Sequence, residues 1–262
     1  MSTLPAWLSL AGRTALITGA GSPTGIGMAT ARSLGELGAR VEITATTVRI
    51  HERARELAAD GIDATGHVID LTDEPAVGRL LADIVSRRES VDVVVNNAGM
   101  VSIGSVAEQG DIEDMTLATW RAGLQRNLDT AFLVSRAAVR SMRARGWGRI
   151  VNVASVTGPV MAMREEPVYA AAKAAMVGFT RALAVDLAGS AITVNAVAPG
   201  WIETGSQLVD EARQGLGTPV GRSARPLEVG SAIAWLCSPG ASYVTGQCLV
   251  IDGGNSIAEE RA

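Results

Sequence analysis

The sequence predicts an α/β protein made of a single doubly wound domain, in which a parallel sheet of seven strands carries helices on both faces. Three observations support this fold class. Short β-branched segments alternate with longer segments of helical period along most of the chain. The length of 262 residues suits one core rather than two. Hydrophobic residues make up 47% of the chain and charged residues 19%, which leaves enough apolar surface for a large core. We therefore expect residues 1–262 to form one domain.

The strands and helices can be assigned in order from Thr14 onwards. Seven strands are expected where β-branched and other apolar residues gather, at residues 14–18, 41–45, 67–69, 91–95, 149–153, 192–197 and 248–251. Helical periods cover residues 25–37, 48–59, 117–145 and 169–187, and another helix starts near Pro226. Residues 201–225 follow neither pattern and are expected to be irregular. Such alternation predicts parallel strands joined by helices.

Charge and composition exclude several kinds of partner. With a formal net charge of −4 and scattered arginines, the chain has no field to attract phosphate backbones, so no nucleic-acid partner is expected. No run approaches the roughly 20 apolar residues of a membrane span, and the first residues lack a basic leader, which predicts a cytoplasmic protein with no membrane partner. The two cysteines are too few for a disulfide framework, and His51 and His67 are not spaced as ligands, so no metal site is expected.

A glycine-rich loop follows the first expected strand. The segment TGAGSPTGIG (residues 18–27) leads into a helix whose inner face carries Ile26, Ala29, Leu34 and Leu37. Glycines let the backbone approach a pyrophosphate closely, and the free N–H groups at the start of a helix favour an anion. The order of strand, glycine loop and helix therefore predicts a dinucleotide-binding site.

The end of the second strand bears on the choice between NAD and NADP. A carboxylate there would bind a free ribose 2′-hydroxyl, but Thr46 and Thr47 follow Ala45 instead. Glu42 lies about 13 Å back from this edge of the sheet, too far to serve. With no carboxylate to repel it, a 2′-phosphate could be bound by the two threonine hydroxyls or by the guanidinium of Arg49. The sequence therefore favours NADP(H), with NAD(H) as the alternative.

The only lysine of the chain, Lys173, lies four residues after Tyr169, one of its two tyrosines. The other members of the 23 Lys and Arg residues are all arginines, and chance would place a sole lysine there about one time in a hundred. On a helix this spacing brings both side chains to one face. A phenol with a pKa of about 10 is a poor acid or base at neutral pH, and a neighbouring ammonium lowers that pKa. The pair therefore predicts a catalytic site.

Together these motifs resemble the short-chain dehydrogenase/reductase family. TG…GIG at residues 18–27, NNAG at 96–99, Ser155 after the fifth strand, the Tyr169 and Lys173 pair, and PGWIET at 199–204 occur in the order of that family. The resemblance runs from about residue 10 to 254 and implies a Rossmann fold and a nicotinamide-dependent oxidoreductase acting on a ketone or secondary alcohol. It implies that Ser155 hydrogen-bonds the substrate oxygen and that Tyr169 exchanges the proton. Lys173 would hold the nicotinamide ribose and lower the pKa of the tyrosine, and Asn127 would hold a water in the proton relay.

The resemblance also implies a set of cofactor contacts at the ends of the strands. Asp70 would contact the adenine, residues 97–99 would flank the adenosine ribose, and Ile202 with Thr204 would grip the carboxamide. Besides Tyr169 and Lys173, the expected set is Gly19, Ser22, Gly25, Ile26, Gly27, Thr46, Thr47, Arg49, Asp70, Leu71, Asn97, Ala98, Gly99, Pro199, Gly200, Ile202 and Thr204.

Three features depart from the family pattern. Five residues separate Gly19 from Gly25 where the family usually has three, so residues 22–24 should bulge. The interval from Ser155 to Tyr169 is one residue longer than usual, which puts an insertion beside the substrate in residues 160–167. The phosphate loop also lacks the basic residue that NADP-dependent relatives often carry.

Within the family, reductases of 3-oxoacyl groups on acyl carrier protein are the nearest resemblance, partly through ATT at residues 45–47. Acyl carrier protein is therefore a candidate partner. Those members usually present an arginine just before the GITVN-like strand, where this chain has Ser190. A basic patch could instead form from Arg140, Arg143, Arg145 and Arg149.

Other readings within this resemblance stay open. An NAD-dependent dehydrogenase of a sugar, steroid or cyclic alcohol is the main alternative, and a non-catalytic NADP-binding sensor is a more distant one. Enoyl reduction is disfavoured, because relatives with that activity have six residues between the tyrosine and the lysine. The family also pairs its two long helices across subunits, which implies a homotetramer.

Overall fold

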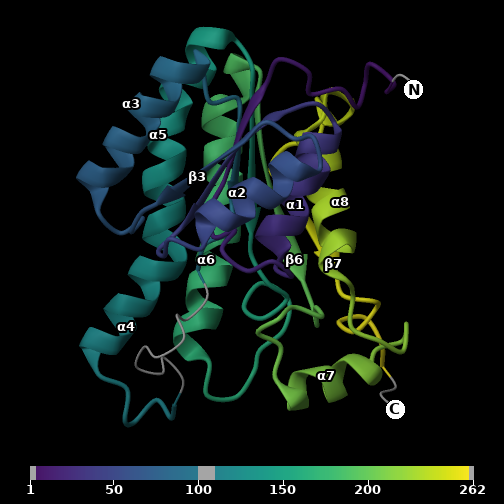
Figure 1. The fold of residues 1–262 in the computed structure, drawn as a ribbon. Coiled ribbons are helices and arrows are strands. Elements are labelled where there is room, and N and C mark those ends of the chain that lie inside the picture. The colour runs from purple at the N-terminus through teal and green to yellow at the C-terminus, as the bar shows by residue number, and fades with distance from the viewer. Residues whose placement is uncertain (1–3, 100–109, 260–262) are drawn as a thin grey trace.

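The computed structural model describes residues 4–99 and 110–259, which form one sheet between two layers of helices (Figure 1). The sheet has seven strands in the order β3-β2-β1-β4-β5-β6-β7, and all neighbouring strands are parallel. The predicted doubly wound fold is confirmed. The strand order reverses between β1 and β4, where open α/β sheets bind ligands beyond the carboxyl ends of the strands. The strands are β1 (Thr14–Ile17), β2 (Arg40–Ala45), β3 (Ala64–Val68), β4 (Val93–Asn96), β5 (Gly148–Val153), β6 (Ile192–Pro199) and β7 (Cys248–Ile251).

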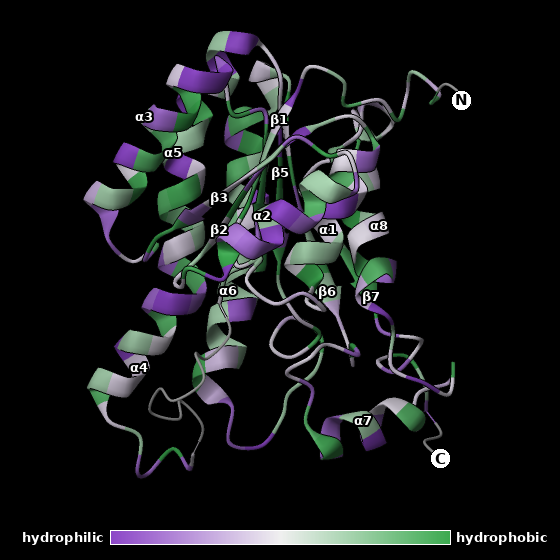
Figure 2. Ribbon diagram, viewed as in Figure 1, coloured by the Kyte–Doolittle hydropathy of each residue, from purple (hydrophilic) through white to green (hydrophobic). Residues whose placement is uncertain are grey.

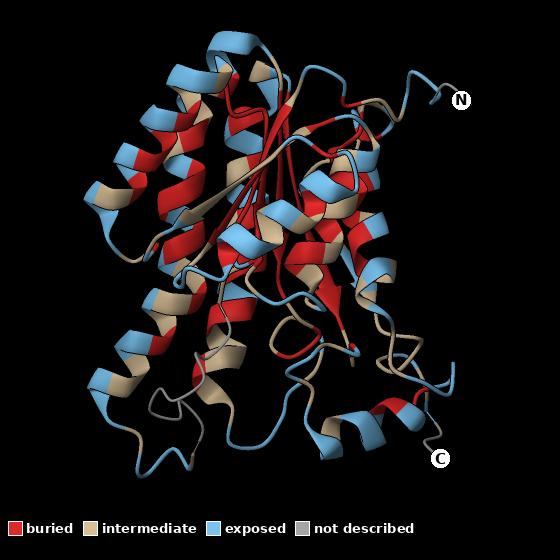
Figure 3. Ribbon diagram, viewed as in Figure 1, coloured by how far each residue is buried: buried red, intermediate tan, exposed pale blue. Residues whose placement is uncertain are grey.

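Each face of the sheet has its own apolar core. Successive residues of a strand point to opposite faces, so Ile17 packs with α1, α2 and α8 while Leu16 packs with α3, α5 and α6. Figures 2 and 3 show the result, with apolar, buried strands between helices that are polar and exposed on their outer sides. The α-helices are α1 (Ile26–Glu36), α2 (Ile50–Ala59), α3 (Glu74–Arg88), α4 (Leu117–Leu124), α5 (Thr130–Arg145), α6 (Pro167–Leu187), α7 (Val209–Leu216) and α8 (Pro226–Cys237).

Two of these helices were not expected from the sequence. α3 fills the interval between β3 and β4, and the chain carries the signals for it: Asp73 caps its first turn by accepting a hydrogen bond from the backbone N–H of Ala76, and Pro75 lies in that turn. α7 lies inside residues 201–225, which were expected to be irregular. Glu211 stabilises its start by accepting a hydrogen bond from the N–H of Leu208 at 2.7 Å.

The long helix expected at residues 117–145 is interrupted. A π-helical turn, η1 (Gln125–Asp129), separates α4 from α5. The side chain of Asn127 donates to the carbonyl of Gly123, and the hydroxyl of Thr130 donates to the carbonyl of Arg126. These side-chain hydrogen bonds satisfy carbonyls in the stretch where the regular ladder is widened.

A chain of polar side chains fixes the two long helices to the centre of the sheet. Asn96 on β4 donates to Ser135 on α5 at 2.9 Å and to Asn152 on β5 at 2.8 Å, and Asn152 donates to Thr180 on α6 at 2.8 Å. All four residues are buried. Because hydrogen bonds are directional, this network sets how α5 and α6 are rotated against the sheet.

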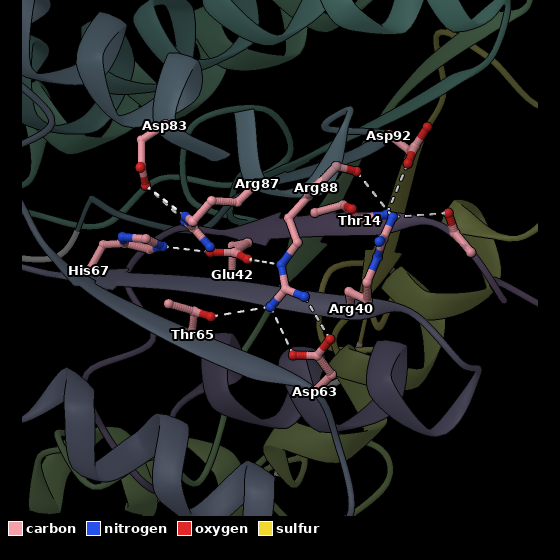
Figure 4. A network of polar contacts seen from close by, with 11 residues as sticks. Thr14, Arg40, Glu42, Asp63, Thr65, His67, Asp83, Arg87, Arg88 and Asp92 are labelled. Atoms are coloured by element: carbon pink, nitrogen blue, oxygen red, sulfur yellow. Dashed lines mark hydrogen bonds and ion pairs between the residues drawn. The ribbon is translucent and has the colours of Figure 1, made fainter. Parts of the chain in front are cut away.

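A second buried network lies on β2, around Glu42 (Figure 4). The Glu42 carboxylate is fully buried and contacts His67 at 2.6 Å, Arg88 at 2.8 Å and Arg87 at 3.3 Å. Arg88 also forms a bidentate pair with Asp63. Burial by itself would raise the pKa of Glu42, but the hydrogen bonds from His67, Arg88 and Arg87 lower it below its ordinary value. Glu42 therefore belongs to the packing of α3 on the edge of the sheet.

The expected basic patch loses one member in the structure. Arg149 is buried, and its guanidinium lies over the ring of Trp147 and donates to the carbonyls of Gly148, Ala191 and Ser238. Burial lowers the pKa of Arg149 to about 10. The prediction that Arg149 contributes to a surface patch was wrong, because the patch was inferred from spacing in the sequence and the strand turns this side chain inward.

Helix α6 and the short turn after it (residues 167–190) are long and apolar enough to cross a membrane by length and composition alone. In this fold the helix packs against β6 and α4, and its buried residues include Lys173 and Thr180. This packing buries 39% of its most apolar stretch, and a core helix of a soluble protein passes the same test of length and composition.

Candidate active site

Three of the four residues expected to be catalytic meet where β5 ends and α6 begins. Ser155 lies two residues after the end of β5, and Tyr169 and Lys173 lie on the first turns of α6. The side chains of Tyr169 and Ser155 are hydrogen-bonded, and the backbone N–H of Thr157 donates to the Ser155 Oγ at 3.1 Å. The Lys173 Nζ lies 5.5 Å from the centre of the Tyr169 ring. The i,i+4 spacing thus places both side chains on one face of the helix, as expected from the sequence.

Lys173 is buried rather than placed on the surface. Its Nζ donates to the carbonyl of Val153 at 2.9 Å, at the end of β5. Burial lowers the pKa of this ammonium to about 8. One partner leaves two of the three ammonium hydrogens available to a ligand. A buried cation with spare donors is suited to hold hydroxyl groups such as those of a ribose.

The pKa of Tyr169 is raised in the structure. Burial is the largest cause, the carboxylates of Glu166 and Glu211 add to it, and the hydrogen bond with Ser155 acts in the opposite direction. The neutral phenol is therefore favoured, which suits a group that donates a proton. That Lys173 lowers this pKa stays a prediction.

We expect Lys173→Arg to lower kcat/KM by about 100-fold or more, although it keeps the charge. The side chain is 4% exposed, so the larger guanidinium has no room and cannot present a compact ammonium beside the tyrosine. Steady-state rates, with circular dichroism to verify folding, measure the effect. Arg181→Lys is the matched control, since Arg181 is exposed on the same helix and its replacement should keep the parent rate. A near-parent rate in Lys173→Arg would refute the role given to the lysine.

Asn127 reaches this cluster from the π turn. It is buried, and its Oδ1 has no hydrogen-bond partner among the residues that the structure describes. A Cβ added to Gly99 would lie 2.9 Å from that oxygen and 3.5 Å from the Lys173 Nζ, so both groups flank the same glycine. A buried acceptor with no partner is costly. Its position beside Lys173 agrees with a proton relay through a bound water, which stays a prediction.

The phosphate loop has the geometry of a close backbone cradle. Gly19 has a φ of +69°, and a Cβ there would lie 2.8 Å from the Cα of Ala98. A Cβ on Gly27 would lie 2.7 Å from the side chain of Asn97. Gly25 is the N-cap of α1 and no side chain caps the helix, whose first turn has no acidic residue. The N–H groups of this helix start are therefore free to bind an anion.

The added residues of the loop protrude, as expected. Ser22 to Gly25 form a turn closed by a hydrogen bond from the N–H of Gly25 to the carbonyl of Ser22, with Pro23 at its second position. Ser22, Pro23 and Thr24 are all exposed.

The end of β4 is tied to this loop. The hydroxyl of Thr18 accepts hydrogen bonds from the N–H groups of Asn97 and Ala98, at 2.9 and 3.0 Å. The Asn97 side chain donates to the carbonyls of Thr18 and Gly19. The NNAG motif and the glycine loop therefore form one rigid edge.

The remaining expected cofactor residues line the same edge of the sheet. Thr46, Thr47 and Arg49 are exposed after β2, where the Arg49 Nε lies 3.5 Å from the Thr47 hydroxyl. Asp70 follows β3 and accepts from the N–H and hydroxyl of Thr72, ahead of the buried Leu71. After β6, a Cβ added to Gly200 would lie 2.8 Å from the Asp252 Cβ. Ile202 forms an isolated β-bridge with Ala224, and the hydroxyls of Thr204 and Ser206 are hydrogen-bonded. The close glycines, the uncapped helix start and the partnerless Asn127 oxygen fit a nicotinamide dinucleotide.

Comparisons with known proteins agree with this geometry. A family model described as Enoyl-(Acyl carrier protein) reductase matches residues 19–256. The 3-oxoacyl-[acyl-carrier-protein] reductase of Pseudomonas aeruginosa is 39% identical over 252 residues, covering 94% of this chain and 98% of that protein. The cis-4-hydroxycyclohexanecarboxylate dehydrogenase of Sinomonas cyclohexanicum is 40% identical over 250 residues, covering 94% and 97%.

Among solved structures, a putative NAD(P)-dependent gluconate 5-dehydrogenase from Beutenbergia cavernae with bound NADP has a TM-score of 0.86 and 40% identity, covering 95% of this chain and 98% of that one. A gluconate 5-dehydrogenase from Burkholderia cenocepacia in complex with NADP and tartrate has a TM-score of 0.87 and 33% identity, covering 97% and 98%. Coverage is nearly complete in every case. The chain therefore belongs to the short-chain dehydrogenase/reductase family, with relatives that include 3-oxoacyl-[acyl-carrier-protein] reductases, and is an NAD(P)-dependent oxidoreductase.

Proposed function

We propose that this protein transfers a hydride between NADP(H) and a ketone or secondary alcohol. The observation that carries the proposal is the cluster of Ser155, Tyr169 and Lys173, in which the chain's only lysine is buried beside the end of β5. A non-catalytic sensor would not need all three side chains at one site. Screening ketones and alcohols with both cofactors by nicotinamide absorbance tests the proposal, and no turnover with any pair would contradict it.

In the proposed mechanism the nicotinamide supplies or accepts the hydride when it is bound. The Ser155 hydroxyl donates to the carbonyl oxygen, where negative charge develops during reduction. The Tyr169 hydroxyl, kept neutral by burial, gives its proton to the same oxygen. Lys173 holds the ribose hydroxyls and stabilises the phenolate once the proton has left. Asn127, whose buried Oδ1 has no partner among the described residues, would hold a water of the proton relay beside this lysine.

The leading single substrate is a 3-oxoacyl thioester, supported by the reductases among the curated relatives. This chain has fewer basic surface side chains that could bind the acidic acyl carrier protein. Ser190 stands where the carrier-dependent relatives usually have an arginine, and Arg149 is buried. A cyclic or sugar alcohol is the second candidate, supported by the cyclohexanecarboxylate and gluconate dehydrogenases. Comparing a 3-oxoacyl thioester, free and on carrier protein, with cyclic alcohols and gluconate would separate them. The spacing of Tyr169 and Lys173 argues against enoyl reduction.

The preference for NADP rests on the end of β2. Thr46 is exposed there, residues 46–49 include no carboxylate, and the guanidinium of Arg49 folds back towards the Thr47 hydroxyl. A guanidinium and hydroxyls suit a phosphate. The proteins of known structure with bound NADP support this choice.

We expect Thr46→Asp to reverse the cofactor preference and to change the ratio of the NADPH and NADH dissociation constants by about 10- to 100-fold. The new carboxylate repels a 2′-phosphate and accepts a hydrogen bond from a free 2′-hydroxyl. Titrations of both cofactors measure the ratio, and Thr46→Asn controls for shape without charge. A parent protein that prefers NADH, or a ratio unmoved by the aspartate, would overturn the assignment.

We also propose that the protein is a homotetramer in the cytoplasm, and that its subunits meet at the groove between α5 and α6. A groove of about 440 Å³ lies between α5 and α6, floored by apolar side chains and edged by Arg140, Arg143 and Asp186. Phe132 is 43% exposed there and packs edge-on against Phe179. Opposite charges at the rim of an apolar groove suit a second copy of the same face, because a two-fold interface must be self-complementary.

Phe132→Glu is expected to shift the protein from tetramers to smaller species, since it places a charge in this apolar groove. Light scattering after size exclusion measures the mass in solution. Ile112→Glu is the control, because Ile112 is exposed outside the groove. A monomeric parent would contradict the proposal, as would a Phe132→Glu variant of unchanged mass.

A further inference from the structure

The protruding turn of the phosphate loop contacts the segment that follows β6. We call residues 200–225 the β6–α8 segment. A Cβ added to Gly205 would lie 2.6 Å from the Thr24 Oγ1 and 3.7 Å from the Ser22 Oγ, so the turn is packed against this glycine. The contact joins two parts of the chain about 180 residues apart, one at the start of α1 and the other beyond the end of β6. Gly205 has ordinary backbone angles, since it is absent from the glycines with positive φ. Its lack of a side chain is needed for the close approach and not for a turn.

Residues 201–207, at the start of the β6–α8 segment, are attached to the body of the protein by Ile202, which is buried in the apolar core, but by no hydrogen bond among the described residues. Within the described part of the chain, all hydrogen bonds of residues 201–207 go to other residues of the same segment. The N–H of Glu203 donates to the carbonyl of Ala224, and the side chain of Gln207 donates to the Ser223 hydroxyl. As far as the structure describes the chain, residues 201–207 are therefore hydrogen-bonded only within their own segment, Ile202 anchors them in the apolar core, and the contact with Thr24 links them to the phosphate loop.

The two added loop residues provide the reach for this contact. The turn places exposed Pro23 at its tip, and Thr24 leaves it on the side that meets Gly205. Proline fixes the backbone at the second position of the turn, so the threonine is held in place rather than free to move away. The hydroxyl groups of Thr204 and Ser206, the two neighbours of Gly205 in the chain, are hydrogen-bonded to each other.

We propose that Thr24 is a positioning residue that latches the phosphate loop to the β6–α8 segment through Gly205. The latch holds the start of that segment beside the N-terminus of α1 before any substrate arrives. It rests on the proposed function in one respect, which is that the α1 end binds the pyrophosphate of a nicotinamide cofactor. The phosphate loop and the β6–α8 segment would then enclose the cofactor as one unit. A substitution at Thr24 would change the position of Gly205, and a substitution at Gly205 would change the position of Thr24.

A double-mutant cycle tests the contact. Gly205→Ala should weaken NADPH binding by about tenfold, because the new methyl group meets the Thr24 hydroxyl and pushes the segment away. Thr24→Ala removes that hydroxyl, so the double variant should bind NADPH as Thr24→Ala alone does. Gly217→Ala is the matched control within the segment, since a Cβ there meets only ordinary contact with the Gln214 carbonyl at 3.5 Å. Cofactor fluorescence titration gives the affinities. An unchanged Gly205→Ala, or a double variant as weak as Gly205→Ala, would overturn the latch.

Hydrogen exchange on the cofactor-free protein tests the latch independently of cofactor binding. Thr24→Ala should raise deuterium uptake in residues 201–208 and leave α3 unchanged, whereas uptake equal to the parent would overturn the proposal. This measurement also decides the matter if Gly205→Ala does not fold. A parent protein that binds no nicotinamide cofactor would refute the proposed function, and the exchange result would still stand for or against the latch.

Discussion

Replacing Tyr169 with phenylalanine is expected to reduce kcat by about 10²- to 10⁴-fold while leaving the cofactor dissociation constant within a few-fold. The hydroxyl that is lost bonds Ser155 and is the proposed proton donor, whereas the ring that packs beside Lys173 is kept. Stopped-flow or steady-state nicotinamide absorbance gives the rate, and fluorescence titration gives the affinity.

The second tyrosine supplies the matched control. Tyr243 is fully exposed, so Tyr243→Phe removes a hydroxyl of the same kind far from any buried partner and should keep the parent rate. If Tyr169→Phe lost cofactor binding together with activity, the tyrosine would have a structural role, and the assignment of the proton to its hydroxyl would fail.

The largest expected effect on stability is at Glu42. Glu42→Gln should lower the free energy of unfolding by about 3 kcal/mol at neutral pH, because Arg87 and Arg88 would be left beside a neutral amide in a buried site. Asp83→Asn is the control from the same network. Its carboxylate is 57% exposed and pairs with Arg87, so the loss of stability there should be much smaller than at Glu42.

We also expect the effect of Glu42→Gln on the free energy of unfolding to depend on pH. The folded-state pKa of Glu42 is lowered relative to the unfolded chain, so its stabilisation is present above the ordinary carboxyl pKa of 4.5 and is lost as the pH falls through the lowered value. Urea unfolding of the parent and Glu42→Gln should therefore differ most near neutral pH and converge in acid. A constant difference across that range would contradict the assignment to Glu42.

The sequence was sufficient where local pattern decides the structure. The β-branched runs gave all seven strands to within a few residues, and Gly25 with the apolar positions after it gave α1, because burial of a strand or a helix face leaves a period in the chain. The pairing of Tyr169 and Lys173 was likewise local, since four residues on a helix fix their relation.

What could not be predicted depends on partners far apart in the chain. Arg149 is turned inward by the carbonyls of Ala191 and Ser238, and Glu42 is held by arginines of α3. The local sequence around Arg149 or Glu42 does not predict these contacts. The packing of Thr24 against Gly205 is of the same kind. The helix α7 was missed for a different reason, because its eight residues are too few for the helical period to stand out.

We expect the π turn at residues 125–129 to make thermal stability and turnover compete in this protein. Deleting one residue there would let α4 and α5 join as a regular α-helix, the more favourable backbone. It would also rotate the residues on one side of the deletion by about 100° against the other, carrying Asn127 away from Gly99 and Lys173. A population selected only for survival at high temperature would be expected to accept this deletion, and one selected for catalysis to reject it. The presence or absence of the extra residue between α4 and α5 would therefore indicate whether selection has favoured catalysis or thermal stability.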